Sequence, residues 1–181
     1  MMKYSAVCLL LLCAPVAFAA QDVAGAVKGT VTSIDRASKV VVVDTGDGAK
    51  HTFHYADDLA VHAGDDSKVA ATDTFHGVGR GSKVAVHYTI DGGRETAHEI
   101  DRIGDGGLKV IHGTVTHVDR GSRRISVATA DGTVETVHLT ANATDDAAKA
   151  TAKGAAKGVK VSVYYTEKAG EKTAHFIEKL G

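Results

Sequence analysis

Histidine is the residue type in this chain whose number and positions could support metal chemistry. Ten histidines occur among the 181 residues. Two positions recur when the chain is aligned with itself, because His54 matches His138 and His98 matches His175. Neutral imidazoles bind Zn²⁺ and Cu²⁺ well, and a histidine pair with a nearby carboxylate or water would form a partial metal site. These four histidines are therefore the candidate metal ligands.

Further histidines in the first half of the chain extend this set of possible ligands. They are His51, His62, His76 and His87. A role outside metal binding is the alternative, since His54 and His138 each follow an apolar residue and lie two positions after a threonine. This alternation favours outward-facing polar positions on strands. The spacing also differs from the metal motif of two histidines four residues apart on a helix.

The first nineteen residues have the layout of a secretory signal peptide. One positive charge at Lys3 precedes an apolar run at 6–14, and 17–19 (AFA) supplies the small residues of a cleavage site. The apolar run is shorter than the roughly 20 residues of a membrane-spanning helix. We therefore expect export to the periplasm or the outside of a bacterial cell, without a membrane span after cleavage. A retained N-terminal anchor is the alternative.

Several kinds of chemistry are excluded by composition after residue 19. The remaining chain contains no Cys, Met, Pro or Trp. Disulfides, iron–sulfur clusters, thiolate nucleophiles and sulfur-lined copper sites therefore cannot form there. The sequence also lacks the G-x-S-x-G pattern of a nucleophile elbow. We expect a protein that is not an enzyme and that has no cofactor, with a Zn or Cu ion as the alternative.

The chain contains two copies of one unit. Residues 28–55 match 112–139 at 13 of 28 positions, and 81–104 match 158–181 at 12 of 24. We expect a signal peptide at 1–19, a first domain at 20–104, a linker at 105–109 and a second domain at 110–181. Net charges of −3 for 27–104 and +2 for 105–181 lack the basic excess of a nucleic-acid-binding protein.

Each copy has the pattern of short antiparallel strands. Val- and Thr-rich runs are separated by turn residues such as Asp47-Gly48 and Asp131-Gly132. A short helix is expected to start at the cap residues Asp145-Asp146, and its counterpart at Asp65-Asp66 is a helix or a loop. The expected strands are 27–34, 39–45, 50–55, 82–89 and 95–102 in the first copy, and 110–118, 123–129, 133–139, 159–166 and 172–180 in the second.

The order of three strands, a short helix or loop and two strands carries a family resemblance. With its GTVT…D…DG and KV-V-YT…TAH-I patterns, each copy resembles secreted bacterial OB-fold-like domains of unknown function. The resemblance implies an all-β fold of two tandem five-stranded, OB-like Greek-key barrels. It also implies that the third and fifth strands are neighbours, so that His54 could face His98 and His138 could face His175. An SH3-like barrel or a short sandwich would give nearly the same order.

Together these patterns predict an exported, non-catalytic tandem β-barrel that acts as a binding or envelope-associated module. Its partner would be a protein or small ligand of the cell envelope, and the chain would be a monomer or a weak homo-oligomer. A periplasmic metal-binding protein that uses the matched histidine pairs is the alternative. Because a domain of about 80 residues buries little apolar surface, we also expect the two barrels to pack on each other.

Overall fold

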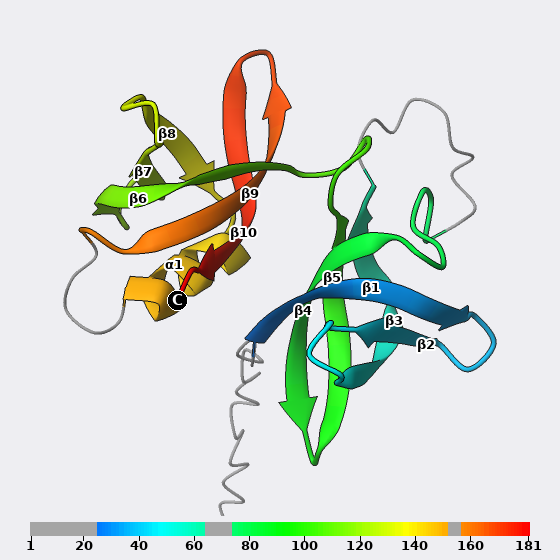
Figure 1. Cartoon of the computed structure of the whole chain (residues 1–181). Coiled ribbons are helices and arrows are strands. Elements are labelled where there is room, and N and C mark those ends of the chain that lie inside the picture. The colour runs from blue at the N-terminus through cyan, green and yellow to red at the C-terminus, as the bar shows by residue number, and fades with distance from the viewer. Residues whose placement is uncertain (1–24, 64–73, 152–156) are drawn as a thin grey trace, which may run out of the picture.

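A computed structural model describes residues 25–63, 74–151 and 157–181, which form ten strands and one helix (Figure 1). The first half contains β1 (Gly25–Asp35), β2 (Val40–Asp44), β3 (Lys50–His62), β4 (Lys83–Asp91) and β5 (Arg94–Arg102). The second half contains β6 (Lys109–Asp119), β7 (Arg124–Ala128), β8 (Val134–Leu139), α1 (Ala141–Thr151), β9 (Lys160–Lys168) and β10 (Glu171–Lys179). The proposed signal peptide lies outside the described residues.

All ten expected strands are confirmed. Their ends lie within two residues of the expected positions, except that β3 continues to His62 instead of ending at 55. Each half forms a closed barrel, with the strand orders β1-β2-β3-β5-β4 and β6-β7-β8-β10-β9. The third and fifth strands are parallel neighbours in both barrels, and the other pairs are antiparallel. The expected all-β fold of two five-stranded barrels is therefore confirmed.

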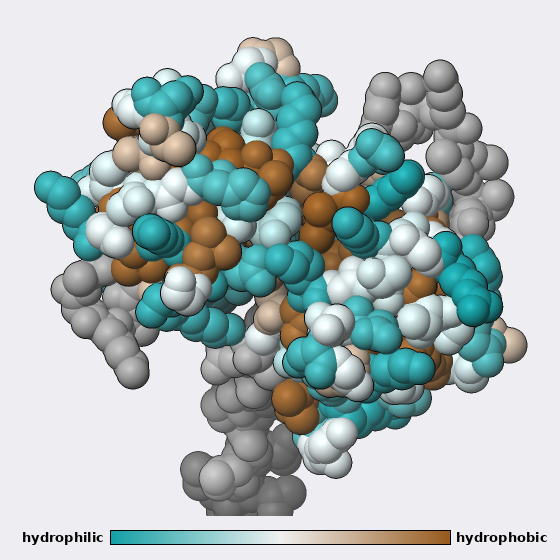
Figure 2. Space-filling view, viewed as in Figure 1, coloured by the Kyte–Doolittle hydropathy of each residue, from teal (hydrophilic) through white to brown (hydrophobic). Residues whose placement is uncertain are grey.

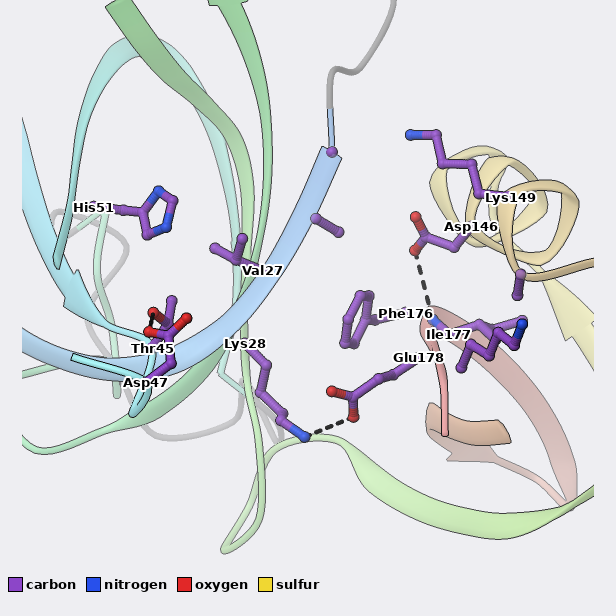
Figure 3. Close-up of a pocket in the computed structure, with 14 residues that line it drawn as sticks. Val27, Lys28, Thr45, Asp47, His51, Asp146, Lys149, Phe176, Ile177 and Glu178 are labelled. Carbon is purple, nitrogen blue, oxygen red and sulfur yellow. Dashed lines mark hydrogen bonds and ion pairs between the residues drawn. The ribbon is translucent and has the colours of Figure 1, made fainter. Parts of the chain in front are cut away.

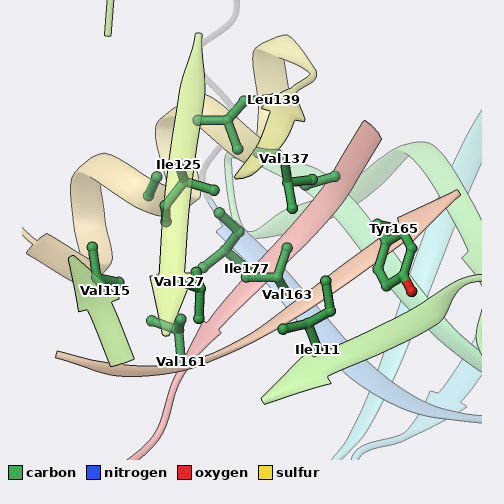
Figure 4. Close-up of a cluster of buried hydrophobic side chains, with 13 residues drawn as sticks. Ile111, Val115, Ile125, Val127, Val137, Leu139, Val161, Val163, Tyr165 and Ile177 are labelled. Carbon is green, nitrogen blue, oxygen red and sulfur yellow. The ribbon is translucent and has the colours of Figure 1, made fainter. Parts of the chain in front are cut away.

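Alternating apolar residues fill the interior of each barrel. Figure 4 shows the core of the second barrel, where Val127 and Val137 meet Val163 and Ile177 from the opposite wall. The first barrel has an equivalent core around the fully buried Phe53. Because both walls consist of β-branched and other apolar side chains that point inward, each closed sheet forms a stable frame for the outward-facing polar residues.

The helix does not begin where the sequence pattern indicates. The expectation that Asp145-Asp146 caps α1 is wrong, since the helix begins at Ala141. The hydroxyl of Thr140 accepts a hydrogen bond from the Ala143 N–H at 3.2 Å and acts as the cap. Asp146 lies within the helix, and its carboxylate is buried against the first barrel. The counterpart pair at Asp65-Asp66 lies outside the described residues.

The expected packing of one barrel on the other is confirmed. A small apolar cluster joins Ala85 of β4 and Leu108 to Tyr164 of β9 and Phe176 of β10. The faces that meet are equivalent in the two copies, because positions 87, 99 and 101 of the first barrel match 164, 176 and 178 of the second. The rest of this junction is polar, and it contains the site described below.

The visible molecular surface is mostly hydrophilic. On the face shown in Figure 2, polar residues cover most of both lobes, and hydrophobic residues form small separate groups. Among the described residues, no helix combines the length and apolar character needed to cross a membrane.

Candidate metal centre

Four side chains of metal-ligand type converge at the junction between the barrels. His62 lies at the end of β3, Glu99 and Asp101 lie on β5, and His175 lies on β10. One potential ligand atom from each residue can be chosen so that all four atoms lie within 4.8 Å of one another. Three of these residues belong to the first barrel and one belongs to the second.

Two β-bulges, one in β5 and one in β10, explain why Glu99 and His175 point away from the barrel interiors. In β5, Ala97 and Glu99 pair with consecutive residues of β4, so His98 is an extra residue in the ladder. His175 is the extra residue of β10 in the same way. A bulge shifts the alternation of the strand, so that two consecutive side chains leave the core and turn outward. Glu99 and His175 thereby reach the junction, while the neighbouring Ala97 stays in the core.

The nitrogen–oxygen separations at this site are close to those between neighbouring ligands of a tetrahedral metal site. Nδ1 of His62 lies 2.9 Å from Oδ1 of Asp101 and 3.3 Å from Oε1 of Glu99. Nδ1 of His175 lies 3.5 Å and 3.6 Å from the same two oxygens. In a tetrahedral zinc site with the usual bond lengths, neighbouring ligand atoms are about 3.3 Å apart. Each of these four nitrogen–oxygen separations therefore lies within about 0.4 Å of the tetrahedral value.

The site combines deep burial with access from one side. The side chain of Asp101 is fully buried, whereas that of His62 is 46% exposed. Hydrogen bonds to Asp101 and Glu99 raise the pKa of the His62 imidazole to about 10. Burial would raise the pKa of Glu99, but contacts with His175 and His62 hold it well below its usual range. Both carboxylates therefore require positive charge beside them, and a metal ion would have to displace the His62 proton.

Several buried polar atoms at this site make no hydrogen bond within the described residues. They are Oδ2 of Asp101, Nδ1 of His175 and Nδ1 of His87. Buried polar atoms in folded proteins nearly always have a partner, because leaving one without a hydrogen bond costs about 1–3 kcal/mol. Two of these three atoms belong to residues of the four-ligand cluster. The cluster therefore has unused ligand capacity in the interior of the junction.

A surrounding layer of side chains holds the ligands in position. Asn142 of α1 donates a hydrogen bond to Oε2 of Glu99, which leaves Oε1 directed at the other ligands. Nε2 of His175 lies 3.0 Å from the hydroxyl of Thr166, so that its Nδ1 is available to the site. Such outer contacts fix ligand orientation in known metal sites.

His87 and Asp146 form a second buried pair beside the ligands. Nε2 of His87 lies 3.1 Å from Oδ2 of Asp146, and Nδ1 of His87 lies 3.7 Å from Oε2 of Glu99. Burial lowers the pKa of His87, but the contact with Asp146 outweighs it and the pKa is raised overall. Positive charge on His87 lowers the pKa of Glu99.

Only one of the four histidines predicted from the sequence joins this cluster. His175 belongs to it, whereas Nε2 of His98 lies 2.8 Å from the hydroxyl of Thr89 on the first barrel. His138 pairs with Glu171 at 3.4 Å, and His54 lies opposite Thr96 in the β3–β5 ladder. The described residues thus show no cluster of three or more ligands around the other three histidines.

His62 is one of the further histidines considered as possible ligands from the sequence, whereas Glu99 and Asp101 were not predicted. A signal for them exists in the repeat, because Glu99 and Asp101 match Phe176 and Glu178 in the second copy. Glu99 is the clearer of the two differences, because a buried carboxylate stands where the second copy has an apolar residue, Phe176.

A groove of about 570 Å³ lies on another side of the same junction (Figure 3). The start of β1 forms one wall, and α1 and β10 form the other. Lys28 crosses between the barrels to Glu178 at 2.6 Å and to the Tyr164 hydroxyl at 3.1 Å. Asp146 faces the groove and also contacts His87, so the groove adjoins the residues that support the metal ligands.

Comparison with known proteins assigns no family to this chain. No protein-family model matches it, and no curated protein sequence matches it.

Proposed function

We propose that this protein is a non-catalytic tandem β-barrel module that binds one divalent transition-metal ion, with Zn²⁺ as the best fit. The ion would be held by His62, Glu99, Asp101 and His175. The observation that carries the proposal is the set of four nitrogen–oxygen separations between the two imidazoles and the two carboxylates, which are 2.9–3.6 Å. This range brackets the value of about 3.3 Å for a tetrahedral zinc site.

The donor types also favour a transition metal over Ca²⁺ or Mg²⁺. Two imidazole nitrogens are ligands that suit Zn²⁺, Cu²⁺ and Ni²⁺, whereas Ca²⁺ and Mg²⁺ prefer sites made only of oxygen. Cu²⁺ generally binds such donors more tightly than Zn²⁺ but prefers a square-planar arrangement. The four nitrogen–oxygen separations are closer to the edges of a tetrahedral site than to the shorter edges of a square-planar site with the same bond lengths, which favours Zn²⁺, and Cu²⁺ is the appropriate comparison.

Calorimetric titration tests the proposal directly. Protein purified without a polyhistidine tag and stripped of metal with EDTA is titrated with ZnCl₂ and separately with CuCl₂. We expect one Zn²⁺ per chain with a Kd of about 1 μM or tighter, since four protein ligands typically give at least 8 kcal/mol of binding free energy. Binding weaker than millimolar for both ions would overturn the proposal.

A matched pair of variants locates the bound ion. His175→Gln removes one ligand, whereas His98→Gln changes the equivalent residue of the other barrel, which has the same threonine contact but lies outside the cluster. We expect H175Q to weaken zinc binding at least about tenfold and H98Q to leave it unchanged. Equal effects of the two substitutions would exclude the junction as the zinc site.

We further propose that the chain is an exported OB-fold protein of the bacterial cell envelope. Support comes from the strand order, in which the first strand pairs with the second and fourth and the third pairs with the fifth, and from the signal-like segment at 1–19. Mass spectrometry of the protein from fractionated cells is the test. A mature form that begins at Ala20 in the periplasm or medium is expected, and an uncleaved cytosolic form would contradict export.

A further inference from the structure

We infer that the metal ion acts as a clamp between the two barrels, so that its binding determines how firmly they are docked. This inference rests on the proposed metal-binding function. It follows from the origin of the ligands, because β3 and β5 of the first barrel supply three of them and β10 of the second supplies His175. The four-ligand site is complete only when the barrels are docked.

The apolar part of the junction is small, so docking of the two barrels also depends on the polar part. Among the described residues, four buried residues form the shared apolar cluster, compared with eleven and thirteen in the two barrel cores. The covalent connection is a short turn at 103–108, which is closed by a bridge between Ile103 and Leu108. The balance of charge at the junction therefore decides much of the docking free energy.

Carboxylates and imidazoles in equal number make up that balance. Glu99 and Asp101 from the first barrel and Asp146 from the second are all buried at the junction. Three imidazoles lie between these carboxylates, at positions 62, 87 and 175. A divalent cation placed between Glu99 and Asp101 adds positive charge where docking removes the carboxylates from water. Docking and metal binding thus favour each other.

Thermodynamic linkage gives the size of this coupling. An undocked first barrel retains three ligands, whereas the docked protein offers four. The factor by which the metal affinity rises on docking equals the factor by which the metal shifts the docking equilibrium. Because even outer contacts of metal sites change affinity 10- to 100-fold, we expect a coupling of at least about tenfold from a direct ligand.

Paired spin labels measure the docking directly. The chain from residue 20 onward, the predicted mature form, contains no cysteine, so that Asp91→Cys and Lys168→Cys introduce the only two thiols. These exposed residues end β4 and β9 at matched positions of the two repeats, one on each barrel. Distances between attached nitroxides are recorded by double electron–electron resonance with excess EDTA and with saturating Zn²⁺, and zinc stoichiometry is measured on the same sample.

With zinc, we expect one narrow distance distribution, and with EDTA a distribution at least about twice as broad or shifted. In the labelled H175Q variant the narrowing should be lost, whereas the labelled H98Q variant should behave like the parent. Identical distributions with and without bound zinc would overturn the clamp while leaving zinc binding intact. Absence of bound zinc in the calorimetric titration would instead overturn the proposed function.

Discussion

Nδ1 of His175 lies 3.5 Å from Oδ1 of Asp101, and this contact joins the second barrel to a fully buried carboxylate of the first. Each residue also has a buried polar atom that makes no hydrogen bond within the described residues. The two barrels therefore meet at a polar site with unused binding capacity.

Zinc should stabilise the folded protein by mass action. A zinc concentration about 100 times the Kd adds about 2.7 kcal/mol to the free energy of unfolding. For a chain of this length, that stabilisation raises Tm by about 5–10 °C. Differential scanning calorimetry with and without ZnCl₂ checks the shift. The Asp101→Asn variant keeps the side-chain shape but removes a charged ligand, and its Tm should change little when zinc is added.

Removal of the Asn142 amide should weaken metal binding without removing a ligand. In Asn142→Ala, the Oε2 atom of Glu99 loses its hydrogen bond from α1, so the carboxylate becomes free to rotate away from the site. We expect zinc affinity to fall about 10-fold or more in calorimetric titration. Asp145→Ala, an exposed change on the same helix, is the control and should leave the affinity unchanged. Equal affinities of N142A and the parent would show that Glu99 is positioned by other contacts.

The metal-free protein should lose stability at both high and low pH. The pKa of His62 is raised from 6.5 to about 10 on folding, so its contribution is complete below pH 6.5 and is lost as the pH rises through about 10. The pKa of Glu99 is lowered from 4.5, so its contribution is present above pH 4.5 and is lost as the pH falls further. The combined contribution of these two groups to the free energy of unfolding should therefore be greatest between about pH 4.5 and 6.5.

Urea unfolding in EDTA, repeated from pH 4 to pH 10, measures this profile. The His62→Gln variant lacks the titrating imidazole, so the decline of its unfolding midpoint between pH 6.5 and 10 should be shallower than that of the parent. A decline as steep as that of the parent would assign the alkaline loss to groups other than His62.

A methyl group at Gly113 should strain the second barrel. An added Cβ would lie within 2.4 Å of the carbonyl oxygen of Ala128 and 2.6 Å of a methyl group of Val127. Gly113→Ala should therefore reduce the free energy of unfolding by about 2 kcal/mol or more, as overpacked cores do. Gly121→Ala is the control, because its nearest neighbour is a side-chain oxygen of Asp119 at 3.4 Å. Equal unfolding midpoints of the two variants in urea would contradict the close approach.

The strand pattern was predictable because it depends on local signals. Alternation of apolar and polar residues, and turns such as Asp131-Gly132, determine where strands form and reverse. The helix start was less predictable, since Thr140 and Asp145 are both good cap residues. The chain uses the earlier one, and the burial of Asp146 against His87 explains why.

The metal cluster was only partly predictable because it depends on contacts between distant segments. His175 is detectable as a repeated residue, but its bulge and its partners from the first barrel follow from the docking of two closed sheets. The matched histidine of the first copy, His98, lacks equivalent partners. The residues of the second barrel that match Glu99 and Asp101 are Phe176 and Glu178, and they contact His87 and Lys28 of the first barrel. Identity of two sequence positions therefore does not imply identity of their surroundings.

The matching faces at the junction have a consequence for how such a protein could arise. Two separate copies of one barrel that met through the same face would be related by a two-fold axis and would carry two identical sites. Once the copies are fused in one chain, each half of the contact can change alone. In this chain one half of the contact has Glu99 and Asp101, whereas Phe176 and Tyr164 at the matching half belong to the apolar cluster. Fusion thus allows the two halves of a symmetric contact to differ in polarity.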